Sequence, residues 1–519
     1  MLSEVFKSIL PQIEPTHADE KVLKVLITGG GPVALTFALE LDELLGNKVS
    51  ITICDGRWTE SHGQMQWKTG AHGNARRQQV VTIQSRQFLK LPAEAQERIF
   101  SEGKYSVMWP AGPDSVNNIP PRNIRIAHFE SRLLELVDEK RERIRLLPIH
   151  YEVDDPKISL NDYHVLAICE GAQSRTREYF ENKFGAGDKS MYSVNGEQVQ
   201  DVVLGLRVVS ELPDPMSVLL TVAQNRFLLN TLHGEGFLYM RLTDEEAEEV
   251  SGIDVQHKVF SECIQSRPCL MERSEHGEFT CATHGTLFLP ALRGDASQLW
   301  SQMEEGLKLF GVREENLSAV TAFRLTMVHR PRFSALVRPP VNEHHGTYAF
   351  LLGDAANAIH FWPGRGLNAG MASAFSLARC LSARWNGAPL RDADFIRHEA
   401  NMAMLQYRNK SRAWRAMVLV DDTGTEVPIK AKIAAALDGD HRDTTDEKSE
   451  LVHTLMKRLD FVQRRLGKRI GKLPSLKVLE GHMEKLSVST LRALVASGHW
   501  DTIATGGEEV DIDWLLGRE

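Results

Sequence analysis

Residues 22–55 contain an apolar strand pattern, a glycine cluster, a helical pattern and a second strand pattern, in this order. Residues 22–28, VLKVLIT, form a short run rich in β-branched side chains, and residues 49–55, VSITICD, form a second. Between them lie a glycine cluster and a segment with apolar residues at helical spacing. Strand, turn, helix and strand at this spacing predict a βαβ unit with two parallel strands.

The middle of the chain changes character. Residues 56–79 are polar, rich in glycine and without period, which predicts a long loop of the kind that often carries function. Residues 186–335 are expected to be strand-rich, because four apolar runs alternate with polar turns. These runs are DVVLGLRVV, SVLLTVA, GFLYMRL and FTCATHGTLFL.

The pattern becomes helical from about residue 390. Within residues 451–466, apolar side chains recur at steps of three and four residues, as an amphipathic helix requires. The charged stretch 438–450, DGDHRDTTDEKSE, predicts a linker between helical parts. These changes of pattern indicate an α/β domain that carries a β-rich insertion and is followed by a helical region.

Composition narrows the class of protein. The 519 residues are 42% apolar and 25% charged, typical of a soluble globular chain with more than one domain. A net charge of -8 gives no electrostatic footprint for nucleic acid. No apolar run is long enough to span a membrane, and MLSEVFKSILPQIEP lacks the pattern of a secretory signal. We therefore expect a cytoplasmic protein without a nucleic-acid partner.

Six cysteines occur without any CxxC pair, which predicts neither a disulfide framework nor a zinc site. We expect ordinary reduced thiols. Glu343, His344 and His345 lie in a polar stretch and are expected to form a loop, not a metal site. The sequence thus predicts no metal ion.

The first motif with chemical meaning is Gly29-x-Gly31-x-x-Ala34, followed by Asp55 at the end of the second predicted strand. Such glycines allow a tight turn and close approach of a pyrophosphate, and the acid accepts hydrogen bonds from ribose hydroxyls. Arg57 leaves open whether the ribose carries a 2′-phosphate. The alternative is a turn with a purely structural role.

The second motif is LLGDAANAIHFWPGRGLNAG, residues 351–370. It resembles the GDAAH-x-x-x-P-x-x-G-x-G-x-N signature of the group A FAD-dependent monooxygenases, the para-hydroxybenzoate hydroxylase type. The matching residues are Gly353, Asp354, Gly364, Gly366, Leu367 and Asn368. The resemblance implies that Asp354 holds the ribityl chain and that the Leu367 and Asn368 amides face the flavin pyrimidine edge. A helix N-terminus there would stabilise the anionic reduced flavin. The sequence departs from the signature at Asn357, where the family has His.

A third segment, HVLAICEGAQSRTRE at 164–178, is similar to the family's G-A-D-G-x-x-S-x-x-R motif, which closes the dinucleotide end of the site. Glu170 and Gly171 stand for its Asp and Gly, and Ser174 and Arg177 match. A strand that ends in an ordinary turn is the alternative. The family often has Arg or Gln over the flavin chain, where this sequence has Ile126 or Ala127.

Residues 73–83, GNARRQQVVTI, are similar to a loop that lies against the flavin in MICAL-type monooxygenases. The similarity implies that Arg77 attracts the nicotinamide cofactor or substrate and that Gln79 faces the flavin ring. A solvated basic turn is the alternative. His360 and Trp362 lie within the flavin signature and could line the pocket or serve packing, and we count Arg77, Gln79 and His360 as candidate catalytic residues.

The resemblance implies an α/β fold: a Rossmann-like FAD-binding domain with an inserted β-rich substrate domain and a C-terminal helical region. The expected parts are 1–185 and 336–395 for the FAD-binding domain, 186–335 for the substrate domain and 396–519 for the helical region. NAD(P)H would reduce the FAD, O₂ would add to it, and the flavin hydroperoxide would hydroxylate a small substrate, which we expect to be aromatic.

Two other functions stay open. One is a flavin-dependent oxidase or halogenase, and the other is a non-catalytic binding protein of the same fold, such as the Rab GDP-dissociation inhibitors. The absence of a second G-x-G-x-x-G after a strand argues against a separate NADPH domain. The helical region could serve as a lid, as a homodimer surface or as a docking site for a carrier protein.

Overall fold

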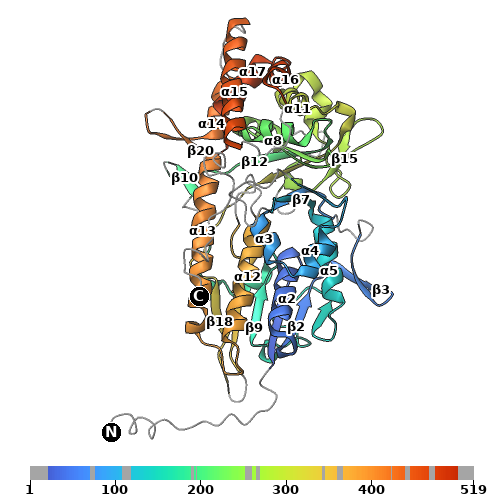
Figure 1. Ribbon diagram of the computed structural model, residues 1–519, viewed down its shortest axis with the longest axis vertical. Helices are drawn as coiled ribbons and strands as arrows, with labels where there is room; N and C mark the ends of the chain where they lie inside the picture. The colour runs from blue at the N-terminus through green and yellow to red at the C-terminus, as the bar shows by residue number, and fades with distance from the viewer. Residues whose placement is uncertain are drawn as a thin grey trace.

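The computed structural model describes most of the chain. The described residues are 22–69, 76–107, 119–188, 192–194, 196–251, 260–264, 269–325, 327–341, 345–358, 366–421, 423–438, 445–466 and 474–500. Figure 1 shows an elongated molecule with one α/β part at the bottom and a second part, built on another sheet, at the top.

The lower part contains a six-stranded sheet in the order β18-β19-β9-β1-β2-β8. Five of its strands are parallel, and β18 at one edge pairs antiparallel with β19. The strands are β18 (Ser334–Arg338), β19 (Thr347–Leu351), β9 (Val165–Ile168), β1 (Leu23–Thr28), β2 (Val49–Cys54) and β8 (Ile144–Leu147). The predicted βαβ unit is confirmed, since β1 and β2 pair in parallel across the helix α2 (Pro32–Leu45).

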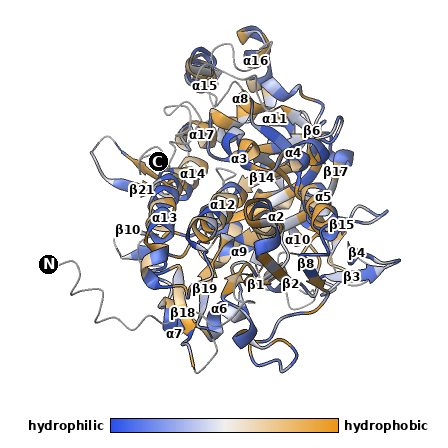
Figure 2. Ribbon diagram, turned by 60° about the horizontal axis from the view of Figure 1, so that its bottom comes forward, coloured by the Kyte–Doolittle hydropathy of each residue, from blue (hydrophilic) through white to orange (hydrophobic). Residues whose placement is uncertain are grey.

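Helices cover both faces of this sheet. In β1, Val25 and Ile27 pack toward one core and Leu26 toward the other, which is the alternation of a strand buried on both sides. The first face carries α2, α5 (Ile126–Asp138) and α12 (Gly366–Arg384). Figure 2 shows α2 and α12 side by side. The second face receives residues of α7 (Glu181–Phe184) and α13 (Ile396–Met417).

Smaller elements lie beside the lower sheet. They are the hairpin β3 (Trp58–Ser61) and β4 (Gln64–Trp67), the three-stranded sheet β5 (Val80–Ile83), β7 (Arg122–Arg125) and β6 (Tyr105–Val107), and the helices α3 (Ser85–Lys90), α4 (Ala93–Ile99) and α6 (Arg175–Tyr179). The prediction of an unstructured loop over 56–79 is therefore wrong in its first half. Trp58 is fully buried and packs edge-to-face on Trp67, so the hairpin is held by its apolar side chains.

The upper part is built on an antiparallel six-stranded sheet in the order β13-β14-β12-β17-β15-β16. Its strands are β13 (Phe227–Leu232), β14 (Glu235–Arg241), β12 (Val202–Val209), β17 (Leu317–Arg324), β15 (Met271–Arg273) and β16 (Phe279–Thr280). The helices α8 (Asp214–Val222), α9 (Asp244–Ser251), α10 (Leu289–Arg293) and α11 (Gln298–Leu309) accompany it.

Two of the four predicted strands in this part are confirmed, and two are wrong. DVVLGLRVV and GFLYMRL form β12 and β14. SVLLTVA lies in α8, because a short, fully apolar run fits a buried helix as well as a strand and the acidic and proline residues at 213–215 start a helix. FTCATHGTLFL gives only the two-residue β16 before a turn.

The last three C-terminal helices complete the upper core, and the first of the four packs against the last in a separate small cluster. The four are α14 (Ile429–Leu437), α15 (Thr445–Leu466), α16 (Leu476–Met483) and α17 (Val488–Ala496). Leu455, Leu459 and Leu491 share one hydrophobic cluster with the upper sheet, so the predicted helix at 451–466 is confirmed and packs by its apolar face. The domain boundaries near 185, 335 and 395 stay a prediction.

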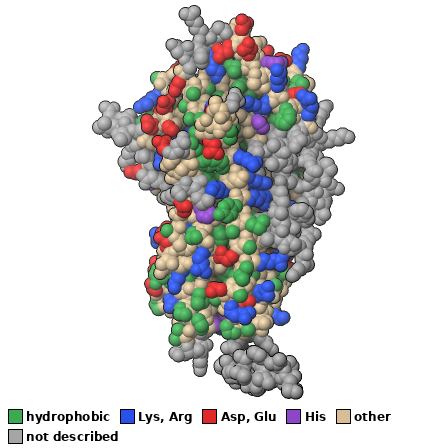
Figure 3. Space-filling view, turned by 90° about the vertical axis from the view of Figure 1, so that its left-hand side faces the viewer, with side chains coloured by type: hydrophobic (Ala, Val, Ile, Leu, Met, Phe, Trp, Pro, Cys, Tyr) green, Lys and Arg blue, Asp and Glu red, His purple; other side chains and the backbone are tan. Residues whose placement is uncertain are grey.

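The long helix α13 runs along one side of the molecule past both parts (Figure 1). Two short hairpins, β10 (Ser193–Val194) with β11 (Glu197–Gln198) and β20 (Val418–Val420) with β21 (Glu426–Pro428), complete the described elements. The face seen in Figure 3 carries exposed side chains of both charges, which fits the small net charge. Among the described helices, none is long and apolar enough to cross a lipid bilayer.

Candidate functional site

Three segments far apart in the sequence meet at one edge of the lower sheet. The parallel strands β1, β2, β9 and β19 all end at this edge, and the chain continues from them into Gly29, Asp55, Cys169 and Leu352. Ligands of open α/β sheets bind beyond the carboxyl ends of the strands. The three sequence motifs are therefore brought together where such a ligand would lie.

The glycines of the first turn have different roles. Gly29 has a φ of +82°, and a Cβ there would lie 2.8 Å from the Cys169 carbonyl oxygen, so the turn packs directly on the third motif. A Cβ on Gly30 would overlap the Trp58 ring. Gly31 is different: a Cβ there would meet only one atom within 4 Å, Arg57 Nη2 at 3.8 Å. The protein itself does not need glycine at position 31, but a close ligand would.

Asp55 already holds the turn in shape. Its carboxylate accepts hydrogen bonds from the Gly30 amide at 2.6 Å and from the Arg57 amide at 2.8 Å, and pairs with Arg57 Nη2 at 2.5 Å. Burial would raise the pKa of Asp55, but the hydrogen bonds and charge of Arg57, with the Gly30 amide, outweigh it and hold that pKa below its ordinary value. Asp55 is therefore ionised, and its carboxylate is bound by Arg57 and by the Gly30 amide.

Asp354 lies where the second motif meets the first. A Cβ on Gly366 would lie 3.8 Å from Asp354 Oδ1, so the carboxylate is next to the first residue of α12. The protein packed around Asp354 raises the pKa of its carboxyl, which the Arg77 charge opposes, yet the side chain is exposed to solvent. Asp354 is therefore a solvent-exposed carboxylate with protein packed around its base, next to the start of α12.

The helix α12 begins beside Asp354 and is fixed there by close packing. A Cβ on Gly370 would lie 2.5 Å from Val33 Cγ2, and one on Gly353 would lie 3.2 Å from the same atom. Glycine at both positions lets the second motif touch the start of α2, whose Ala34 is fully buried. The first amides of a helix have no partner within the helix, so the α12 N-terminus can bind an anionic edge.

Asn368 fixes the start of α12 through its side chain. The side chain is buried, accepts a hydrogen bond from the Gln84 amide at 2.9 Å and donates one to the Thr82 carbonyl at 2.7 Å. The preceding residue, Leu367, packs against the core of the lower sheet. The motif asparagine therefore positions α12, while the ligand-facing role predicted for residues 367 and 368 concerns their backbone amides.

Arg77 and Gln79 lie beside the N-terminus of α5. Their carbonyl oxygens accept hydrogen bonds from the Ala127 and Ile126 amides, both at 3.0 Å. Arg77 pairs with the buried Glu130, while its side chain is 48% exposed. The Gln79 Oε1 atom is buried and has no hydrogen-bond partner in the part of the chain that the structure describes. A buried, unpartnered amide oxygen is costly, which fits a ligand donor at this position.

The Glu170 carboxylate serves its own loop. It accepts hydrogen bonds from Ser174 Oγ at 2.6 Å, Thr176 Oγ1 at 2.7 Å and the Thr176 amide at 3.1 Å. Ser174 in turn caps α6 by accepting from the Arg177 amide, and Gly171 turns the chain with a φ of +87°. These contacts favour the structural role for the Glu170 side chain and leave the backbone of this turn to face the site.

Several expected residues are not in the site or cannot be placed. His360, Trp362 and Gly364 lie outside the described residues. The two residues flanking the expected flavin-chain anchor have partners elsewhere: Arg125 pairs with Glu235 at 2.6 Å, and His128 Nε2 contacts the Ile99 carbonyl at 3.0 Å. Neither one therefore replaces the family's Arg or Gln.

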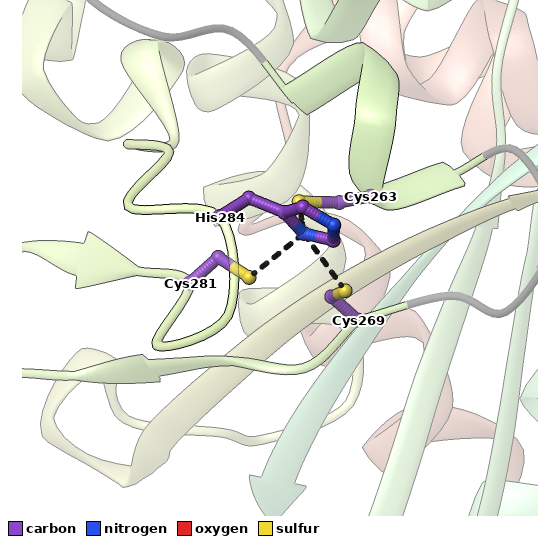
Figure 4. Close-up of side chains that lie close together, drawn as sticks. All are labelled: Cys263, Cys269, Cys281 and His284. Carbon is purple, nitrogen blue, oxygen red and sulfur yellow. Dashed lines mark hydrogen bonds between the residues drawn. The ribbon is translucent and has the colours of Figure 1, made fainter. Parts of the chain in front are cut away.

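One cluster is not predicted by the sequence pattern. The cysteines are free, as expected, but Cys263, Cys269 and Cys281 lie around His284, with all four ligand-type atoms within 4.8 Å of one another. Figure 4 shows them converging from separate segments. The sequence pattern gave no zinc spacing, because folding brings together residues whose spacing follows no CxxC rule. Only the Cys281-x-x-His284 pair gave a local signal.

No family model matches the chain, and no curated protein does. Solved structures give weak similarities. They include 2-methyl-3-hydroxypyridine-5-carboxylic acid oxygenase (TM-score 0.39, 13% identity, 76% of this chain and 89% of that one). They also include the Diels-Alderase PyrE3 (TM-score 0.44, 15% identity, 75% of this chain and 72% of that one). A third is CtdE in complex with FAD (TM-score 0.41, 12% identity, 75% of this chain and 93% of that one). These TM-scores are low, so the assignment of a function rests on the residues of this chain and their motifs.

Proposed function

We propose that this protein is an FAD-dependent monooxygenase that uses NAD(P)H and O₂ to hydroxylate a small aromatic substrate. The observation that carries the proposal is the meeting of three flavoprotein-like motifs at the carboxyl edge of one parallel sheet. The resemblance of residues 351–370 to the group A signature supplies the reaction class.

The geometry of the residues present is compatible with FAD. The space beside Gly31 is nearly free of protein atoms, and this supports a pyrophosphate there. Asp55 is ionised and lies next to Gly30, as the acid after the second strand of such a site should. By the resemblance, the exposed Asp354 would hold the ribityl hydroxyls and Gln79 would face the ring system.

When bound, FAD would supply the redox chemistry with NAD(P)H and O₂. The chain would contribute binding, orientation and charge. The α12 N-terminus would stabilise negative charge at the pyrimidine edge, and Arg77, half-exposed and anchored by Glu130, would attract an anionic nicotinamide cofactor or substrate. Glu130 would hold the Arg77 guanidinium in place through their ion pair.

The test begins with the absorbance spectrum of the purified chain after incubation with FAD. We expect flavin bands at about one FAD per chain and aerobic NAD(P)H consumption that rises when a panel of aromatic compounds is added. Hydroxylated product in the mass spectrum should accompany that rise. Flavin binding with unstimulated oxidation and peroxide as the only product would favour the oxidase. A chain that does not bind FAD would contradict the monooxygenase and favour a non-catalytic binding protein.

A further inference from the structure

Three cysteines and one histidine form a compact cluster at the β15–β16 edge of the upper sheet, far in sequence from the flavin motifs. His284 Nδ1 lies 3.5 Å from Cys263 Sγ, 3.4 Å from Cys269 Sγ and 3.5 Å from Cys281 Sγ. One nitrogen is thus nearly equidistant from three sulfur atoms (Figure 4). Neither packing nor a hydrogen-bond network requires such equality.

The three distances from His284 Nδ1 match the nitrogen–sulfur edges of a tetrahedral metal site. With Zn–S bonds of about 2.3 Å and a Zn–N bond of about 2.0–2.1 Å, a sulfur and a nitrogen ligand lie about 3.6 Å apart. The three observed separations of 3.4–3.5 Å agree closely with that edge. Three thiolates with one imidazole are a common donor set of closed, structural zinc sites.

The residues around the four side chains form a tight turn and contact the cluster. Thr286 Oγ1 contacts Cys263 Sγ at 3.0 Å. A contact from outside the cluster of this kind helps to orient a ligand side chain. Gly285, with a φ of +63°, closes the turn after the histidine, and the Cys281 carbonyl accepts its amide at 2.8 Å.

We propose that Cys263, Cys269, Cys281 and His284 bind one structural zinc ion. All four protein ligands would fill a tetrahedron, so no position is open for substrate and the site is not catalytic. The flavin chemistry proposed above does not use these residues, so the zinc proposal does not depend on it.

The ion would join three segments that contain only short helices and strands. Cys263 lies in the 3-10 helix η7 (Phe260–Ile264), Cys269 lies just before β15, and Cys281 and His284 follow the two-residue β16. A three-residue and a two-residue strand contribute few ladder hydrogen bonds at the edge of a sheet. Zinc ligation would therefore supply the binding energy that holds this edge closed.

The test is the metal content of the full chain, produced in zinc-supplemented medium without a metal-affinity tag and kept reduced. We expect about one zinc ion per chain by inductively coupled plasma mass spectrometry. X-ray absorption at the zinc edge should give three sulfur ligands at about 2.3 Å and one nitrogen at about 2.0–2.1 Å.

Variants separate ligation from folding. Cys269→Ser and His284→Ala alter partly exposed ligands and should each weaken zinc binding by at least about tenfold. Cys380→Ser, at a partly exposed cysteine outside the cluster, should leave zinc content unchanged. A wild-type chain that neither contains zinc nor takes it up under reducing conditions would overturn the proposal, as would a spectrum with only oxygen and nitrogen ligands. FAD binding by such a chain would leave the flavin function intact.

Discussion

At the scale of single residues, the fold does not require glycine at position 31, whereas a ligand that binds close to the backbone would. Its backbone, at φ -72° and ψ -179°, suits any residue, and its Cβ position is nearly empty. Gly30, one position earlier, must be glycine because of Trp58. Within a turn that begins a helix at the carboxyl edge of the sheet, this free space is where a pyrophosphate would fit.

We predict that Gly31→Val folds normally and loses FAD. The valine side chain would enter the space of the pyrophosphate, so FAD affinity should fall by at least about tenfold, or ~1.4 kcal/mol. The thermal midpoint of the FAD-free protein should stay at the wild-type value. Gly481→Val, in α16 and away from the site, is the control, because a Cβ on Gly481 meets nothing within 4 Å. Normal FAD binding by Gly31→Val would show that the turn is purely structural.

Asp354→Asn is predicted to weaken FAD binding without harming the fold. The change keeps the shape of the side chain but removes its charge, which costs about 1.5–3 kcal/mol for a charge-assisted hydrogen bond, or roughly tenfold to a hundredfold in affinity. Fluorescence titration of the FAD-free protein measures the change. Asp162→Asn, at an exposed aspartate of a surface turn, should leave the affinity unaltered. Equal affinities for wild type and Asp354→Asn would remove this residue from the site.

At the scale of elements, the site depends on how closely α12 packs on α2. Gly370 and Gly353 both face Val33, so two motifs more than 300 residues apart touch through one side chain. Such contacts are sensitive to one methyl group, because protein interiors are close-packed.

We predict that Gly370→Ala destabilises the protein by about 1–3 kcal/mol through overpacking. The new methyl group would lie 2.5 Å from Val33 Cγ2, and α12 would have to shift. Val33→Ala in the same chain should recover part of the loss, since the remaining neighbours lie 3.4 Å or more from the new methyl group. Urea midpoints of the two single variants and the double variant give the coupling. Additive losses would show that the helices do not meet as described.

Local sequence patterns predicted the elements that depend on near neighbours. The β1–α2–β2 unit and α15 follow from periodicity and glycine placement, and both were predicted. Residues 217–223 were misassigned because periodicity does not separate a short apolar helix from a strand, and tertiary packing decided it. The motifs indicated the candidate site, but the hydrogen bonds of Glu170 within its loop and the Cys–His cluster depend on contacts made only by folding.

At the scale of the whole molecule, buried histidines set a dependence of stability on pH. Burial lowers the pKa of His398 to about 3. Burial, followed by the nearby charges of His345 and Lys24, lowers the pKa of His164 to about 3. Histidine in an unfolded chain titrates near pH 6.5, so the unfolded state binds more protons between about pH 6.5 and 3. Stability is fully present above about pH 6.5 and is lost as the pH falls toward 3.

We therefore predict that the urea midpoint falls between about pH 7 and pH 5, with up to one proton taken up per buried histidine on unfolding. His398→Gln should reduce this fall, because one of the two groups no longer titrates. His453→Gln, at an exposed histidine of α15, should leave the slope unchanged. A wild-type midpoint that does not move over this range would contradict the assignment of neutral buried imidazoles.

The core of the upper part has a consequence for synthesis of the chain. Its apolar side chains come from residues as far apart as Val202 and Leu494. On the ribosome, the upper sheet would be made long before α15–α17 emerge to cover it. That surface must wait, exposed to chaperones and to other nascent chains, until almost the last of these residues has been translated. Early termination within the helical region would thus release a chain with an uncovered sheet, prone to aggregation before any cofactor could bind.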